Sequence, residues 1–181
     1  MKRIYCFVLF LLPFLSKAQD DSLVYRQDID SLINRFFTSE PEPLYRFVND
    51  VPHWKHHTRQ ANWFYNRYVT ANGDTMVCFG LKYLAANFID FDEQYILLNN
   101  GLVYAGSNRR TEVNTYTGVK LEQEQHLGGI EYYFRKDLLV STRTQPYGFP
   151  PEGWTKPEYA LQKFRERYEI LQSWLKAHSV K

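Results

Sequence analysis

Cysteine is scarce in this chain, and that scarcity limits how the fold can be held together. The 181 residues include 2 cysteines, Cys6 and Cys78. Cys6 lies in an apolar N-terminal segment that we expect to be removed, which would leave Cys78 without an intrachain partner. The disulfide framework of many small secreted domains is therefore excluded for the mature chain. A hydrophobic core must stabilise it, and a domain of this size can bury one.

Recognisable catalytic motifs are also lacking. The sequence has no Gly-x-Ser-x-Gly elbow, no glycine-rich phosphate loop and no His-Glu-x-x-His pair. The first absence disfavours a common type of serine hydrolase, and the other two disfavour nucleotide-binding loops and helical zinc proteases. Gly128-Gly129 precedes a predicted strand and indicates a bulge or turn.

One apolar run is present, at the N-terminus, and it is short. A cationic start at residues 1–3 is followed by apolar residues 4–12, and small side chains precede Gln19. This order predicts a signal peptide over residues 1–18, cleaved after Ala18. The alternative, a membrane anchor, needs about 20 apolar residues. We therefore expect a secreted or periplasmic mature chain, residues 19–181, forming a single domain.

The charge balance changes once the signal is removed. The whole chain has 22 basic and 20 acidic residues, and Lys2, Arg3 and Lys17 belong to the predicted signal. The mature chain is then close to neutral, with no basic run longer than Arg109-Arg110. Nucleic-acid binding would need a basic excess, so we do not expect it. Low cysteine content and a short signal favour a bacterial envelope.

The middle of the chain alternates apolar and polar residues, which predicts an antiparallel sheet. The expected strands are residues 63–69, 77–83, 95–98, 102–105, 112–120, 130–135 and 138–144. Turn residues separate three pairs of them: Asn72-Gly73-Asp74, Asn99-Asn100-Gly101 and Arg135-Lys136-Asp137. Tight turns between short strands indicate a meander of about five to seven strands.

Two amphipathic helices are expected at the ends of the mature chain. Apolar spacing predicts the first over residues 20–38. For the second, Thr155 and Glu158 form the pattern of a capping box, and Trp154 can pack on Tyr159. Its apolar stripe is Leu161, Phe164, Tyr168, Leu171 and Leu175, with Lys163, Arg165, Glu166, Arg167 and Glu169 on the opposite face. The fold class is thus α+β, with both helices packed on one face of the sheet. Residues 44–60 are ambiguous, with a short helix over 44–49 as one option.

Three histidines make the strongest candidate for a metal site. His53, His56 and His57 lie within five residues, and in a helix His53 and His57 would share a face, a spacing that zinc sites use. A catalytic zinc site also needs a further ligand and a base, which His126 or the acids of residues 90–93 could supply. The alternative is an exposed polar loop with Trp54 packed beneath it.

Cys78 and Glu131 are candidates for direct chemistry. Cys78 could act as a nucleophile if a nearby base activated its thiol. The alternative is a buried side chain, because it lies within an alternating strand and cysteine is often buried. Glu131 could form a carboxylate pair with an acid of residues 90–93, and its alternative is a solvent-facing strand position.

Aromatic side chains gather in a proline-rich segment, residues 145–154. Tyr147, Phe149 and Trp154 could be held on a stiff backbone as a ligand-binding surface, since proline lowers the entropy cost of ordering a loop. The alternative is that these rings fold down and cap the core beside the second helix.

Three functional hypotheses follow. The leading one is a non-catalytic binding or interaction module for an unknown protein, small molecule or glycan, without a cofactor. The second is a small metal-assisted hydrolase, in which His53, His56 or His57 would bind zinc. The third is a structural or assembly factor without a small-molecule site.

Overall fold

A computed structural model of the chain describes residues 21–34, 44–52, 58–69, 73–84, 89–113, 119–145, 151 and 153–178. These residues belong to two compact units, Met1–Pro41 and Glu42–Lys181. In the first unit, residues 21–34 form a helix, in agreement with their apolar spacing. The predicted signal peptide lies outside the described residues, and the single domain over residues 19–181 stays a prediction.

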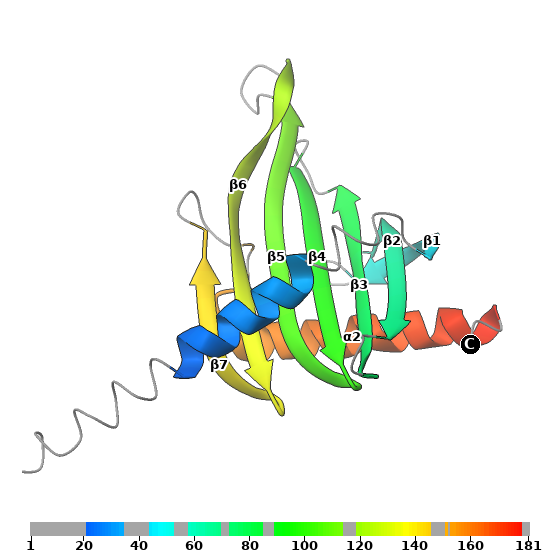
Figure 1. Ribbon diagram of the computed structural model, residues 1–181. Helices are drawn as coiled ribbons and strands as arrows, with labels where there is room; N and C mark the ends of the chain where they lie inside the picture. Colours follow the sequence, from blue (N-terminus) through cyan, green and yellow to red (C-terminus); the bar gives the residue numbers. More distant parts are fainter. Residues whose placement is uncertain are drawn as a thin grey trace, which may run out of the picture. The chain divides into compact units, whose positions relative to one another are not determined.

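The second unit contains a seven-stranded antiparallel sheet in which each strand pairs with its neighbours in sequence (Figure 1). The strands are β1 (Tyr45–Pro52), β2 (Thr58–Val69), β3 (Thr75–Leu84), β4 (Ile89–Leu98), β5 (Gly101–Val113), β6 (Lys120–Arg135) and β7 (Leu138–Thr144). Together with the helices, the sheet confirms the α+β class and the meander.

The tight turns lie where the turn residues predict them. Asn99 and Asn100 connect β4 to β5 with φ of 50° and 66°, and Lys136 and Asp137 connect β6 to β7 with φ of 53° and 62°. Two successive residues with positive φ make a turn whose twist matches that of the flanking strands. Gly73, in the loop between β2 and β3, also has a positive φ, of 84°.

The structure decides one segment that the sequence left ambiguous and contradicts one predicted strand. Residues 44–49 do not form a helix, because Phe47 packs across the strand pair on Trp63, with ring centroids 5.4 Å apart. Residues 112–120 do not form one strand, because β5 ends at Val113 and β6 begins at Lys120.

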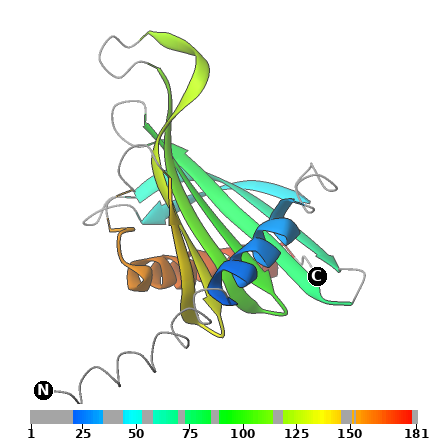
Figure 2. The same cartoon turned by 60° about the vertical axis from the view of Figure 1, so that its left-hand side comes forward.

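The helix α2 (Pro157–Ala177) crosses one face of this sheet (Figures 1 and 2). Its aromatic side chains pack on three strands: Phe164 lies 6.3 Å from Phe79 of β3 and 5.8 Å from Tyr95 of β4, and Trp174 lies 4.1 Å from Phe47 of β1. The main core is thus between α2 and the sheet. The placement of the N-terminal helix on that face stays a prediction. No helix in the described ranges has the length and apolar composition needed to span a membrane.

The start of α2 differs from the predicted capping box. The N-cap is Lys156 and makes no side-chain cap hydrogen bond. Pro157 is the first helical residue, and its fixed φ and missing N–H suit that position. The N-cap therefore lies one residue after the predicted cap, Thr155. The expected contact of Trp154 with Tyr159 is present, with the rings edge-on and 6.4 Å apart.

Candidate functional site

Most of the predicted site residues lie outside the described part of the chain. This applies to His53, His56 and His57, and to Tyr147 and Phe149. Their proposed metal-binding and ligand-binding roles stay predictions.

Trp154 is described, and it is 2% exposed. Its backbone carbonyl accepts a hydrogen bond from the Tyr132 hydroxyl, and its ring lies 6.3 Å from that of Tyr95. Trp154 therefore belongs to the core beneath α2, and it lines neither of the two hollows described below.

The acids of residues 90–93 are divided between the two faces of the sheet and are engaged in separate ion pairs. On one face, Asp90 pairs with Lys82 at 2.9 Å and Asp92 pairs with Arg110 at 2.8 Å. On the face covered by α2, Glu93 pairs with Arg167. Among the described residues, no three His, Cys, Asp or Glu side chains lie close enough together to hold a metal ion.

Glu93 is the centre of a buried polar network. Its carboxylate accepts hydrogen bonds from Arg167 Nε at 2.8 Å and Nη2 at 3.1 Å, from the Tyr83 hydroxyl at 3.1 Å and from the Tyr95 hydroxyl at 3.0 Å. Burial raises the pKa of both tyrosines, and the Glu93 carboxylate raises these pKa values further. Burial would lower the pKa of Arg167, but the facing carboxylate raises it more. These four hydrogen bonds link α2 to β3 and β4 through the Glu93 carboxylate.

The sequence prediction placed Arg167 and Lys163 on the solvent face of α2, and this is wrong. Both are buried, in line with Ala160, Leu171 and Leu175. The positions are three or four residues apart, so the spacing was a usable signal. It was missed because charged residues are rarely buried without a partner, and the partner of Arg167, Glu93, lies on a distant strand.

Glu131 also differs from its predicted exposed position. It is 8% exposed, accepts a hydrogen bond from the Tyr133 hydroxyl at 3.1 Å, and forms an ion pair with Arg143 of β7. Its carboxylate is thus engaged within the sheet, and Glu93 lies on the opposite face.

Cys78 is fully buried, as expected for an alternating strand. Burial raises the pKa of its thiol to about 12. The thiolate that a nucleophile requires is therefore strongly disfavoured at neutral pH.

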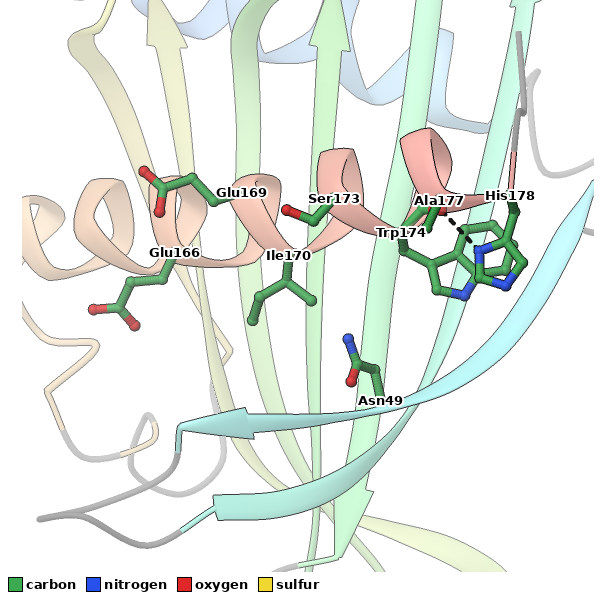
Figure 3. A pocket seen from close by; sticks show the side chains of 8 residues that line it. All are labelled: Asn49, Glu166, Glu169, Ile170, Ser173, Trp174, Ala177 and His178. Carbon is green, nitrogen blue, oxygen red and sulfur yellow. Dashed lines mark hydrogen bonds between the residues drawn. The ribbon is translucent and has the colours of Figure 1, made fainter.

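Two accessible hollows lie on the two sides of α2. The first, which we call the α2–β1 groove, is a hollow of about 490 Å³ between the helix and strand β1 (Figure 3). Its lining residues are Asn49, Glu166, Glu169, Ile170, Ser173, Trp174, Ala177 and His178. Seven of these eight come from α2 or its C-cap, at three- and four-residue spacing, so they form one stripe along the helix.

A stack of rings closes one end of the α2–β1 groove. The Trp174 ring lies between Phe47, at 4.1 Å, and His178, at 4.3 Å. His178 Nδ1 also lies 2.8 Å from the Trp174 carbonyl oxygen (Figure 3). These contacts fix the groove wall, because a stacked ring has few alternative positions.

Acidic side chains border the α2–β1 groove at its other end. Burial acts to raise the pKa of Glu166, but hydrogen bonds from Lys163 and Gln162, both at 2.8 Å, lower it overall. Glu166 is therefore ionised at neutral pH. Glu169 is exposed one turn further along. The groove thus combines an apolar floor at Ile170 and Trp174 with a border of two carboxylates, of which Glu166 is ion-paired with Lys163 and Glu169 is exposed.

The second hollow, the turn pocket, lies on the opposite side of α2 and has a volume of about 560 Å³. It is lined by Tyr65, Arg67, Thr75, Val77, Asn99, Asn100, Tyr168, Gln172, Leu175 and Lys176. These residues come from β2, β3, the β4–β5 turn and α2. In contrast to the groove, this pocket has two cations and no carboxylate among its lining residues.

Comparison with known proteins gives no match to this chain, whether among family models, characterised sequences or solved structures. The function must therefore be inferred from the residues themselves.

Proposed function

We propose that this chain is an exported, non-catalytic interaction module that binds an extended polypeptide segment in the α2–β1 groove. The observation that carries the proposal is a groove with a fixed apolar floor and an ionised border. In contrast, Glu93, Arg167 and Cys78 are buried; Glu93 and Arg167 are engaged with each other, and the thiol of Cys78 is inert. Within the described chain, the groove is accessible to a binding partner. The candidate catalytic groups are buried and are not accessible to a substrate.

The dimensions of the groove suit an extended segment. From Glu166 to His178 the helix advances by about 18 Å at about 1.5 Å per residue. An extended chain covers that length with about five or six residues, at about 3.3 Å each. Because alternate side chains of such a chain point to opposite sides, every second residue would face the groove.

The chemistry of the groove selects the partner. Apolar side chains would pack on Ile170 and Trp174, and a basic side chain would lie beside Glu169. We therefore expect the partner segment to carry both apolar and basic residues. Export follows from the predicted signal over residues 1–18, and the segment with Tyr147 and Phe149 remains a second proposed contact surface.

The test uses a fluorescent synthetic peptide that alternates valine and lysine, with a valine–glutamate peptide as its counterpart. Fluorescence anisotropy should show that the full chain binds the lysine peptide and not the glutamate peptide. Glu169→Lys should weaken binding by about fivefold, as expected for an exposed charge contact. Ile170→Ser should weaken it as well, because the apolar floor is lost.

Glu158→Lys is the matched control. Glu158 is exposed on the same helix, about 16 Å from Glu169 along the axis. This variant should bind the lysine peptide as the parent does. Equal binding of both peptides, or an unchanged affinity for Glu169→Lys, would contradict the proposal.

A further inference from the structure

The turn pocket is built on a fixed floor. The Asn99 backbone N–H donates to the Thr75 carbonyl at 2.8 Å, and the Thr75 N–H donates back to Asn99 Oδ1 at 2.9 Å. Asn99 Nδ2 also donates to Asp74 Oδ1 at 2.7 Å. These bonds link the loop before β3 to the β4–β5 turn. They also occupy the Asp74 carboxylate, which does not line the pocket.

The charges in the turn pocket are of one sign. Arg67 at the end of β2 and Lys176 in the last turn of α2 are both exposed and line the pocket. Burial raises the pKa of Tyr65, and the nearby Arg67 guanidinium opposes that increase. The Tyr65 hydroxyl therefore stays protonated at neutral pH, as a neutral hydrogen-bonding group beside two cations.

The rest of the lining is part polar and part apolar. Thr75, Asn100 and Gln172 have side chains that can donate hydrogen bonds, while Val77 and Leu175 are apolar. The volume of about 560 Å³ falls within the range of small-molecule sites. An arginine and a lysine together are typical of sites that bind a carboxylate or a phosphate.

We infer that the turn pocket binds a small organic acid, with its carboxylate between Arg67 and Lys176 and its apolar body against Val77, Leu175 and Tyr168. This site is separate from the α2–β1 groove, on the other side of the helix, and does not depend on the function proposed for the groove.

The test compares four probes with the same chain length: hexanoate, hexan-1-ol, hexyl phosphate and hexylamine. Isothermal titration calorimetry on the full chain at low salt should detect hexanoate, with hexan-1-ol binding about tenfold more weakly because it lacks the charge-assisted hydrogen bonds. Arg67→Ala and Lys176→Ala should each weaken hexanoate binding by about fivefold. Arg67→Glu should bind hexylamine in preference to hexanoate.

Arg165→Ala is the control, because Arg165 is an exposed cation on α2 that does not line the pocket. It should leave hexanoate affinity unchanged. The inference is overturned if hexanoate does not bind, if hexan-1-ol binds equally well, or if Arg67→Ala and Lys176→Ala have no effect. Tighter binding of hexyl phosphate than of hexanoate would overturn the assignment to an organic acid and indicate a phosphate ester instead.

Discussion

The guanidinium of Arg167 on α2 meets the carboxylate of Glu93 on β4 through two contacts, with both side chains 1% exposed. The two residues are 74 positions apart in sequence. Tyr83 and Tyr95 complete the hydrogen bonding of the carboxylate. A buried ion pair of this kind adds little net stability but penalises arrangements that separate its partners. Here it fixes where α2 lies on the sheet.

Removing one partner of this pair should strongly destabilise the protein. Arg167→Met leaves the Glu93 charge buried and unpaired, and we expect the free energy of unfolding to fall by about 3 to 5 kcal/mol. Urea denaturation followed by circular dichroism measures this change. The double variant Glu93→Gln with Arg167→Met should recover part of the loss, because no uncompensated charge remains.

The exposed pair Lys82–Asp90 provides the matched control. Its side chains are 42% and 18% exposed, so Lys82→Met should cost less than about 1 kcal/mol. Similar losses for Lys82→Met and Arg167→Met would show that the buried network has no special role.

The stability of the fold should fall at alkaline pH. Burial and the Glu93 carboxylate raise the pKa of Tyr83 and Tyr95 in the folded state, whereas tyrosines of the unfolded chain titrate near about 10. Above that pH the unfolded chain binds fewer protons than the folded protein. The stabilisation that comes from keeping these two phenols protonated is therefore complete below about pH 10. It is lost as the pH rises toward the pKa values that the two tyrosines have in the folded protein.

Urea unfolding at pH values from about 8 to about 11 tests this prediction, and each buried phenol should contribute a slope of about 1 kcal/mol per pH unit at the upper end. Tyr83→Phe, with one phenol fewer, should show a shallower decline. A free energy of unfolding that stays constant over this range would refute the expectation.

The start of α2 offers a stabilising substitution. Lys156 is the N-cap, has an extended backbone with φ of −118° and ψ of 128°, and makes no side-chain cap bond. Lys156→Asp should place a carboxylate where it can accept a free N–H of the first turn, and should stabilise the fold by about 1 kcal/mol. Thermal or urea unfolding measures the gain.

Thr155→Ala distinguishes the observed cap from the capping box expected from sequence. Since Thr155 is exposed and precedes the N-cap, this variant should change stability by less than about 0.5 kcal/mol. A loss of about 1 kcal/mol would instead indicate that Thr155 is the cap.

Cys78 should be protected from alkylation in the native protein. It is fully buried, and burial raises the pKa of its thiol to about 12. Iodoacetamide at neutral pH should leave the Cys78 peptide unmodified, as measured by mass spectrometry after digestion, and should modify it fully in urea. Rapid native labelling at this position would mean that β3 opens locally.

Local sequence patterns were sufficient to predict most of the helices and strands in the described chain. The turn residues Asn99-Asn100 and Asp137 predict two hairpins, because asparagine and aspartate adopt a positive φ more readily than most residues. The local pattern was insufficient to predict the strand at residues 44–49, because that strand forms by pairing with β2. It was also insufficient to predict that β5 ends at Val113 and β6 begins at Lys120, where one strand over residues 112–120 was expected.

The composition of the candidate sites depended on tertiary structure more than the helices and strands did. The sequence alone determined the α+β class, the meander and α2, because backbone conformation and the apolar period are set by neighbouring residues. It could not determine that Glu93 meets Arg167, that Glu166 faces β1, or that Arg67 and Lys176 line one pocket. Those pairs come from elements far apart in the chain, and only the packing of α2 across the curved sheet brings them together.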